Sequence, residues 1–168
     1  GLGLAIDAFQ RPGRNDAAMM LVGPVDPKTE QRFRGFMSGE HGIDGVRLAG
    51  PLFRDDRDRF LGSIDAFVHT SRWEGGVPNS VIEAAAMARP LLITRHADPD
   101  DLLYKSGGCV RVDLDPDSIA EGMRRLMEMP PEERAAMGSR AARAVESAFG
   151  WDKVAQGLIQ GLQDHGVR

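Results

Sequence analysis

The sequence is short of the features that mark secreted and membrane proteins. It contains one cysteine, Cys109, and no apolar run of about eighteen residues. A single cysteine forms neither an internal disulfide nor a zinc site built from several cysteines, which favours a reducing compartment. The first ten residues lack the basic start and long apolar stretch of a secretory signal. We therefore expect a cytoplasmic protein.

Neither charge sign is in large excess. The 21 basic and 25 acidic residues are mixed along the chain and leave a formal net charge of −4. The basic footprint typical of nucleic-acid or anionic-membrane binding is missing, so we expect no nucleic-acid partner. The four histidines are scattered, without acidic or histidine partners at metal-ligand spacing, so we expect no metal. An anionic ligand must therefore be bound by local groups.

Short apolar runs rich in β-branched residues alternate with segments of helical spacing. This alternation predicts an α/β fold with a Rossmann-like open parallel sheet flanked by helices. At 168 residues, with no linker or repeat, the chain is expected to form a single domain, residues 1–168. The predicted strands are Met19–Gly23, Val46–Gly50, Ala66–Thr70, Leu91–Thr94 and Cys109–Val112.

Helical spacing and turn residues place the helices between these strands. Asp115 before Pro116 predicts a capped helix over residues 116–129, and Pro130 and Pro131 start another that ends at Gly150. A last helix follows, with Trp151 as its expected packing anchor. The remaining predicted helices are 4–9, 29–37, 55–62 and 79–88.

The segment after the third predicted strand has the residues of an anion site. Ligands of open parallel sheets bind beyond the carboxyl ends of the strands, where turns lead into helices. There, Gly75 and Gly76 allow close backbone approach, and the next helix begins with unpaired N–H groups that favour a phosphate. Glu83 shares a helix face with Asn79 and Ser80, and a carboxylate can accept hydrogen bonds from two vicinal hydroxyls.

Simpler interpretations of the same residues stay open. Ser80 and Glu83 have the spacing of a capping box, which would only satisfy the first N–H groups of the helix. Glu74 is equally consistent with a solvated loop carboxylate. Arg72 either contacts a phosphate or is simply exposed, and His69, at a strand end, either touches a ligand or packs within the sheet.

The stretch SRWEGGVPNSVIEAAAMARP, residues 71–90, resembles the donor-binding signature of the group-1 (GT4-type) retaining GT-B glycosyltransferases. The likeness extends over almost the whole chain. Residues 1–9 resemble the glycine-led helix that opens the family's C-terminal domain, and LVGP its second strand. Asp65 stands at the acidic position before the apolar run AFVHT, and FGWDKVA resembles the motif that begins the terminal helix.

The resemblance implies a role for each matching residue. Glu74 would contact donor-sugar hydroxyls, with Gly75 and Gly76 beside the diphosphate. Glu83 would hold the ribose hydroxyls. The remaining implied nucleotide contacts are Asn79 and Ser80 at the helix start, Gly50, Pro51 and Leu52 beside the base, Gly23 on the phosphate side, and Arg72 on a phosphate.

The chain departs from the family pattern in three places. Eight residues separate Glu74 from Glu83, one more than the family usually has. The loop after Thr94 reads RHADPDD instead of an acidic residue and a glycine pair. The family's first strand and its paired Arg and Lys, which neutralise the diphosphate, stand immediately before the glycine that matches Gly1, and are not in this sequence.

The resemblance implies that the chain is the donor-binding domain of a larger two-domain enzyme. The reaction that the resemblance implies moves a hexose from a nucleoside diphosphate (NDP) sugar, with retention and no metal or other cofactor. A carbohydrate or lipid-linked acceptor would bind an N-terminal domain, which would also mediate any membrane association. Without its first strand, the fragment alone would transfer little or nothing.

Two other classes of function remain to be weighed. The first is a non-catalytic, Rossmann-like nucleotide-binding module, or a degenerate transferase that serves as a partner subunit. The second is a dinucleotide-dependent oxidoreductase, which is disfavoured because no G-x-G-x-x-G follows any predicted strand.

Overall fold

The computed structural model describes residues 1–11, 17–31 and 45–165. All five predicted strands form, and every neighbouring pair runs parallel, which confirms the α/β class. Three strands have the predicted bounds, whereas the first is one residue shorter at its carboxyl end and the third is one residue shorter at each end, because strand ends fray where pairing stops. The strands are β1 (Met19–Val22), β2 (Val46–Gly50), β3 (Phe67–His69), β4 (Leu91–Thr94) and β5 (Cys109–Val112).

The five strands lie in two parallel sheets instead of one continuous sheet. β1 pairs with β2, and the second sheet has the order β3-β4-β5. Within the described residues no strand pairing joins β1 to β3, so each of these strands keeps one unpaired edge.

Helices connect the strands, and two of them, η1 and α5 between β4 and β5, were not predicted from the sequence. Residues 27–31 are helical, with Asp26 accepting a hydrogen bond from the Thr29 amide at 3.0 Å, while the rest of the predicted helix 29–37 lies outside the described residues. The other helices are α1 (Leu2–Gln10), α3 (Arg54–Ser63), α4 (Asn79–Ala86), the 3₁₀ helix η1 (Arg95–Ala97), α5 (Leu102–Lys105), α6 (Pro116–Glu128), α7 (Pro131–Phe149) and α8 (Trp151–Asp164).

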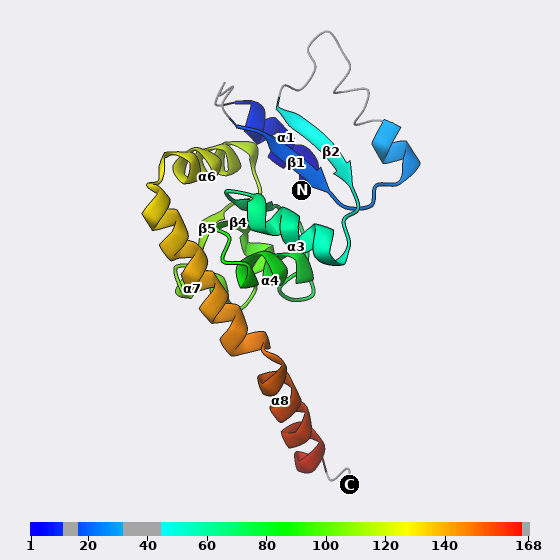
Figure 1. Ribbon diagram of the computed structural model, residues 1–168, viewed down its shortest axis with the longest axis vertical. Helices are drawn as coiled ribbons and strands as arrows, with labels where there is room; N and C mark the ends of the chain where they lie inside the picture. Colours follow the sequence, from blue (N-terminus) through cyan, green and yellow to red (C-terminus); the bar gives the residue numbers. More distant parts are fainter. Residues whose placement is uncertain (12–16, 32–44, 166–168) are drawn as a thin grey trace.

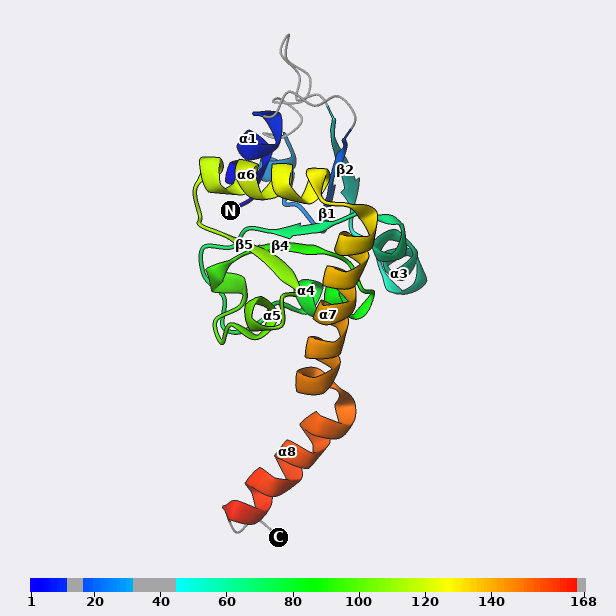
Figure 2. The ribbon, with the colours of Figure 1, turned by 90° about the vertical axis from the view of Figure 1, so that its left-hand side faces the viewer.

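The three-stranded sheet separates two apolar cores. Alternate residues face opposite sides, so Val68, Leu92 and Val110 pack with α1 and α6. Leu91 and Ile93 face the other way, toward α4 and α7. Figure 2 shows α1 and α6 on one side of this sheet and α4, α5 and α7 on the other. Every residue of β4 is buried, as befits a central strand covered on both faces.

The helices on each side are fixed by specific contacts. Asp115 caps α6, accepting a hydrogen bond from the Ser118 amide at 2.9 Å, which confirms the predicted cap. On the other side α7 crosses close to the end of α4. A Cβ built on Gly138 would lie 1.9 Å from the carbonyl oxygen of Ala88, so only glycine permits this approach.

The last helix leaves the body of the domain. α8 projects away from both sheets (Figure 1) and contains no buried residue. Trp151 is 86% exposed, so its predicted role as a packing anchor is wrong within this chain. Leu158 and Ile159 are exposed on the same helix, which therefore presents an apolar surface that nothing in the described chain covers.

Candidate functional site

The loop 71–78 leaves the carboxyl end of β3 and leads into α4. Its start is tied to the neighbouring strand by Thr94, a fully buried residue at the end of β4. The Thr94 hydroxyl donates to the Ser71 carbonyl at 2.9 Å and accepts from the Ser71 amide at 3.1 Å. The Ser71 hydroxyl in turn donates to the Trp73 carbonyl at 2.9 Å. The loop therefore begins from a fixed position at the sheet edge.

Glu74 is held within this loop. The Nε2 atom of His69 lies 3.1 Å from Glu74 Oε1, and the two side chains are 25% and 27% exposed. The hydrogen bond from His69, with a smaller contribution from Ser71, lowers the pKa of Glu74 below its ordinary value. Glu74 is thus a partly buried, hydrogen-bonded carboxylate, and the interpretation as a freely solvated loop residue is wrong.

The start of α4 is open to an anion. Asn79 and Ser80, its first two residues, are exposed, and Pro78 precedes them as the N-cap. The amides of Val81 and Ile82 donate to the Pro78 carbonyl, while those of Asn79 and Ser80 have no hydrogen-bond acceptor among the described residues. A Cβ built on Gly75 or Gly76 would meet no atom within 4 Å. Free N–H groups and open space therefore lie next to each other.

The capping-box interpretation of Ser80 and Glu83 is wrong. A capping box requires Ser80 to precede the helix, but α4 already begins at Asn79 and has no side-chain cap hydrogen bond. Glu83 is the fifth residue of the helix, whereas the glutamate of a capping box is the third. Its Oε1 instead lies 2.6 Å from Nη1 of Arg57, on α3.

Arg57 is the partner that sequence reasoning missed. It stands 26 residues before Glu83 in a run of alternating charges, which is typical of a solvated helix start. The same guanidinium also pairs with Asp58 at 2.9 Å. No local sequence signal distinguishes Arg57 from its neighbours Arg54 and Arg59, because the contact arises only when α3 lies beside α4.

The residues predicted beside the base and phosphates meet at the ends of β1 and β2. The Gly23 amide donates to the Gly50 carbonyl at 3.0 Å. Both glycines have positive φ, +141° and +72°, which favours glycine over a residue with a side chain. Pro51 is exposed and Leu52 half-buried, and α3 begins two residues later. Within the described residues, no hydrogen bond or ion pair joins this corner directly to loop 71–78.

Arg72 is the cation nearest in sequence to the open start of α4. It is exposed, and no hydrogen bond or ion pair joins it to the described residues, although its charge lowers the pKa of the nearby Gly1 amino group after the larger effect of burial. Trp73 beside it is 79% exposed. The position of Arg72 is therefore consistent with both interpretations of the sequence, a phosphate contact and a simply exposed side chain. An exposed arginine also has a charge that an anion can approach.

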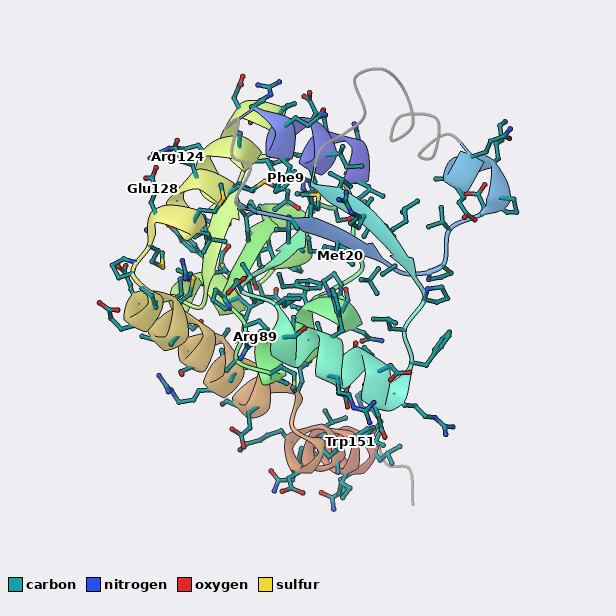
Figure 3. The ribbon with its side chains drawn as sticks, turned by 45° about the horizontal axis from the view of Figure 1, so that its top comes forward. Phe9, Met20, Arg89, Arg124, Glu128 and Trp151 are labelled. Atoms are coloured by element: carbon teal, nitrogen blue, oxygen red, sulfur yellow. The ribbon has the colours of Figure 1, made fainter. Side chains whose placement is uncertain are left out.

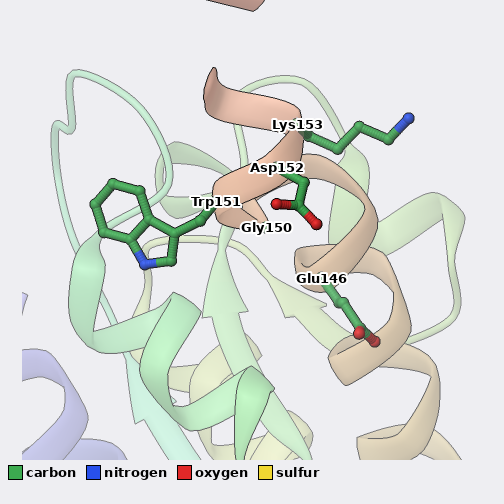
Figure 4. Close-up of a pocket in the computed structure, with 5 residues that line it drawn as sticks. All are labelled: Glu146, Gly150, Trp151, Asp152 and Lys153. Atoms are coloured by element: carbon green, nitrogen blue, oxygen red, sulfur yellow. The ribbon is translucent and has the colours of Figure 1, made fainter. Parts of the chain in front are cut away.

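Two hollows of the surface lie away from loop 71–78 and the start of α4. One, at the bend between α7 and α8, is lined by Glu146, Gly150, Trp151, Asp152 and Lys153 (Figure 4). A second lies on α6 beside Arg124 and Glu128, which are labelled in Figure 3. Neither contains a predicted donor-site residue. In the part of the chain that the structure describes, no group of three or more His, Cys, Asp or Glu side chains is arranged to hold a metal ion.

A family model described as "Glycosyl transferases group 1" matches residues 1–129, a span that includes every predicted site residue. The chain belongs to this family. Among curated proteins, this chain is 29% identical over 127 residues to spore coat protein SA of Bacillus subtilis (strain 168). The match covers 74% of the chain and 32% of that relative, so the chain spans about a third of the relative's length.

Solved glycosyltransferase structures share the fold. Anabaena HepE, in complex with UDP and glucose, superposes with a TM-score of 0.80 at 16% identity, over 97% of this chain and 44% of that one. Sucrose-phosphate synthase from Thermosynechococcus elongatus gives 0.80 at 18% identity, over 96% and 42%. These likenesses confirm the predicted Rossmann-like fold of the C-terminal half of a GT-B glycosyltransferase.

The described helices do not meet the requirements of a membrane-spanning helix. No helix in residues 1–11, 17–31 or 45–165 combines the length and the apolar character that crossing a bilayer requires.

Proposed function

We propose that this group 1 glycosyl transferase chain is a donor-binding domain that holds an NDP-sugar. The whole protein would transfer a hexose, with retention, to a carbohydrate or lipid-linked acceptor. The observation that carries the proposal is the arrangement of Glu74 and Glu83 on either side of the open start of α4. Each carboxylate has one oxygen tied to a neighbouring element, to His69 and to Arg57 respectively. The side chains of Glu74 and Glu83 are 27% and 36% exposed, so a ligand can reach both carboxylates.

The diphosphate would lie between the two carboxylates. The amides of Asn79 and Ser80 and the positive end of the α4 dipole attract an anion there, and the charge of Arg72 adds to them. Open space beside Gly75 and Gly76 lets phosphate oxygens approach the backbone. The same groups would stabilise the diphosphate as it leaves the sugar. The proposal requires no resident metal.

The nucleoside and the sugar would occupy opposite ends of this site. Glu83 would accept hydrogen bonds from the two ribose hydroxyls, with the base toward Gly50, Pro51 and Leu52 and with Gly23 on the phosphate side. Glu74 would accept hydrogen bonds from the donor sugar. Similar structures support a uridine nucleotide as the first to test, since HepE was solved with UDP and with UDP-glucose.

The rest of the whole protein would supply the acceptor site. This chain covers 44% of HepE, and α8 exposes apolar residues that a second domain would cover. The unpaired edges of β1 and β3 would accept a further strand between them. We propose on these grounds that the chain alone transfers little sugar and that the whole protein works in the cytoplasm, where Cys109 stays reduced.

Thermal unfolding with nucleotides tests the donor site. The whole protein is melted with UDP, GDP and ADP and with their glucose conjugates, as wild type and as Glu83→Ala. A ligand at about a hundred times its dissociation constant stabilises a protein by roughly 2.7 kcal/mol, which gives a measurable shift. We expect one nucleotide to raise the melting temperature of the wild type, and Glu83→Ala to lose most of that rise.

Glu128→Ala is the matched control. Glu128 is also a helical glutamate paired with an arginine, Arg124, but it lies on α6 outside the site. It should respond to nucleotide as the wild type does. An equal response from Glu83→Ala would remove Glu83 from the site. Nucleotide binding without sugar transfer by the whole protein would favour the non-catalytic module or partner subunit.

A further inference from the structure

The imidazole ring of His69 is held in place by a stacking contact with Phe67. It is the last residue of β3, and its ring stacks on that of Phe67 with centroids 6.4 Å apart and planes 11° apart. Phe67 lies two residues earlier on the same face of the sheet and packs against the core beneath α4 and α7. The apolar core therefore holds the plane of the imidazole.

The direction of the hydrogen bond between His69 and Glu74 follows from the chemistry of the pair. An ionised carboxylate only accepts hydrogen bonds, so Nε2 of His69 carries the hydrogen that Glu74 Oε1 accepts. The lowered pKa of Glu74 keeps that carboxylate ionised at neutral pH. A ring held by the core thus donates to a carboxylate on a loop.

The loop needs such an anchor after Glu74. Gly75 and Gly76 follow directly, and neither has an atom within 4 Å of the place where a side chain would begin. The ties that Thr94 and the Ser71 hydroxyl make to the backbone fix the loop as far as Trp73. At Glu74 itself, the hydrogen bond from His69 is the larger of two side-chain contributions, and Ser71 supplies the smaller one.

We propose that His69 is a positioning residue for donor-sugar recognition. It holds Oε1 of Glu74 so that the second carboxylate oxygen faces the hydroxyls of the sugar. This inference rests on the proposed function and deepens it, since it assigns selection of the NDP-sugar over the bare nucleotide to the pair His69 and Glu74. His69 itself need not touch the ligand.

The test compares two ligands on the whole protein by isothermal titration calorimetry. Binding of UDP measures the affinity for the nucleotide, and binding of UDP-glucose adds the contacts of the sugar. If the melting experiment selects another nucleotide, that nucleotide and its glucose conjugate replace these two ligands. We expect His69→Leu to weaken the sugar conjugate relative to the nucleotide by roughly three- to tenfold, the effect of one hydrogen bond. Affinity for the nucleotide alone should stay at the wild-type value.

Three further variants separate positioning from packing. His69→Gln, which keeps an N–H donor of similar reach, should recover part of the selectivity. Glu74→Ala should lose as much selectivity as His69→Leu or more, and adding His69→Leu to it should cost nothing further. His96→Leu, an exposed histidine on η1, should match the wild type. Where His69→Leu does not fold, His69→Asn replaces it, because its shorter amide does not reach Glu74.

The binding measurements distinguish failure of the positioning role of His69 from failure of the proposed function. An unchanged ratio of the two affinities in His69→Leu overturns the inference, as does an equal loss of both affinities, which would indicate packing alone. A wild-type protein that binds neither the nucleotides nor their conjugates overturns the proposed function itself, and the inference with it.

Discussion

Nη1 of Arg57 lies 2.6 Å from Oε1 of Glu83, and this ion pair joins α3 to α4. The contact has a structural consequence for the candidate site, because α3 begins two residues after the segment Gly50–Leu52. The pair therefore fixes the corner at the end of β2 relative to the carboxylate proposed to hold the ribose. Glu83 is placed by a tertiary contact in addition to its position on the helix.

Arg57→Gln should affect nucleotide binding more than stability. The two side chains are 39% and 36% exposed, so solvent screens their attraction and the melting temperature without ligand should stay close to the wild-type value. The melting-temperature rise given by the nucleotide should shrink, but by less than in Glu83→Ala, since the carboxylate remains. Melting curves with and without ligand measure both effects. A variant that keeps the full rise would show that Glu83 needs no partner.

Gly76→Ala should reduce donor binding without destabilising the fold. A Cβ at this position meets no atom within 4 Å and the backbone needs no positive φ, so the protein alone has room for it. The added methyl would occupy the space proposed for the diphosphate and should lower affinity for the NDP-sugar by about tenfold. Titration calorimetry measures the affinity, and thermal unfolding the stability. Gly161→Ala, on exposed α8, is the control expected to bind normally.

Gly138→Ala should destabilise the domain. Its Cβ would lie 1.9 Å from the Ala88 carbonyl oxygen, so α7 and α4 would have to separate. Overpacking of this kind typically costs about 1–3 kcal/mol. Urea unfolding followed by circular dichroism measures the change. Gly157→Ala, a helical glycine on α8 with open space around it, should instead leave stability unchanged or raise it slightly. Equal stability of Gly138→Ala and wild type would contradict the close helix packing.

Cys109 should react slowly with alkylating reagents in the folded protein. Burial, with a smaller contribution from Asp98, raises the pKa of its thiol to about 12. Relative to the ordinary value of 9.0, this lowers the thiolate fraction at neutral pH by about a thousandfold. Iodoacetamide labelling followed by mass spectrometry should show protection that is lost in urea. Rapid labelling of the folded chain would be the contrary result.

The same pKa shift gives stability a pH dependence of known sign. Between the ordinary thiol value of 9.0 and about 12, the unfolded chain loses the Cys109 proton while the folded chain keeps it. The unfolded state then binds fewer protons, so the contribution of Cys109 to stability falls as pH rises through this window. Cys109→Ser should show a shallower fall in urea unfolding measured across that range.

Much of the site was predictable because its residues are close in sequence. The signature around residues 71–90 located Glu74, the glycine pair and Glu83 at a strand end before a helix, and the family match includes all of them. The partners of the two carboxylates were harder to predict. The sequence leaves two interpretations open for His69, and the alternating charges around Arg57 are typical of a solvated helix start.

The capping box shows why local spacing was insufficient. Ser80 and Glu83 have the right separation, but the role of each depends on where the helix begins, and α4 begins one residue before Ser80. The predicted packing role of Trp151 was wrong for a related reason. An aromatic residue at a helix start usually packs, but α8 extends beyond both sheets and meets no core.

The sequence by itself determined the strands, their parallel arrangement and the order of the helices. These follow from runs of β-branched residues, helical periodicity and capping residues, all of which act over a few neighbouring positions. Only the tertiary structure decided that the strands divide into two sheets, that Glu83 pairs with Arg57 and that α8 remains uncovered. Those outcomes depend on which surfaces meet after the chain has folded, and contacts between residues far apart in the sequence leave no local pattern.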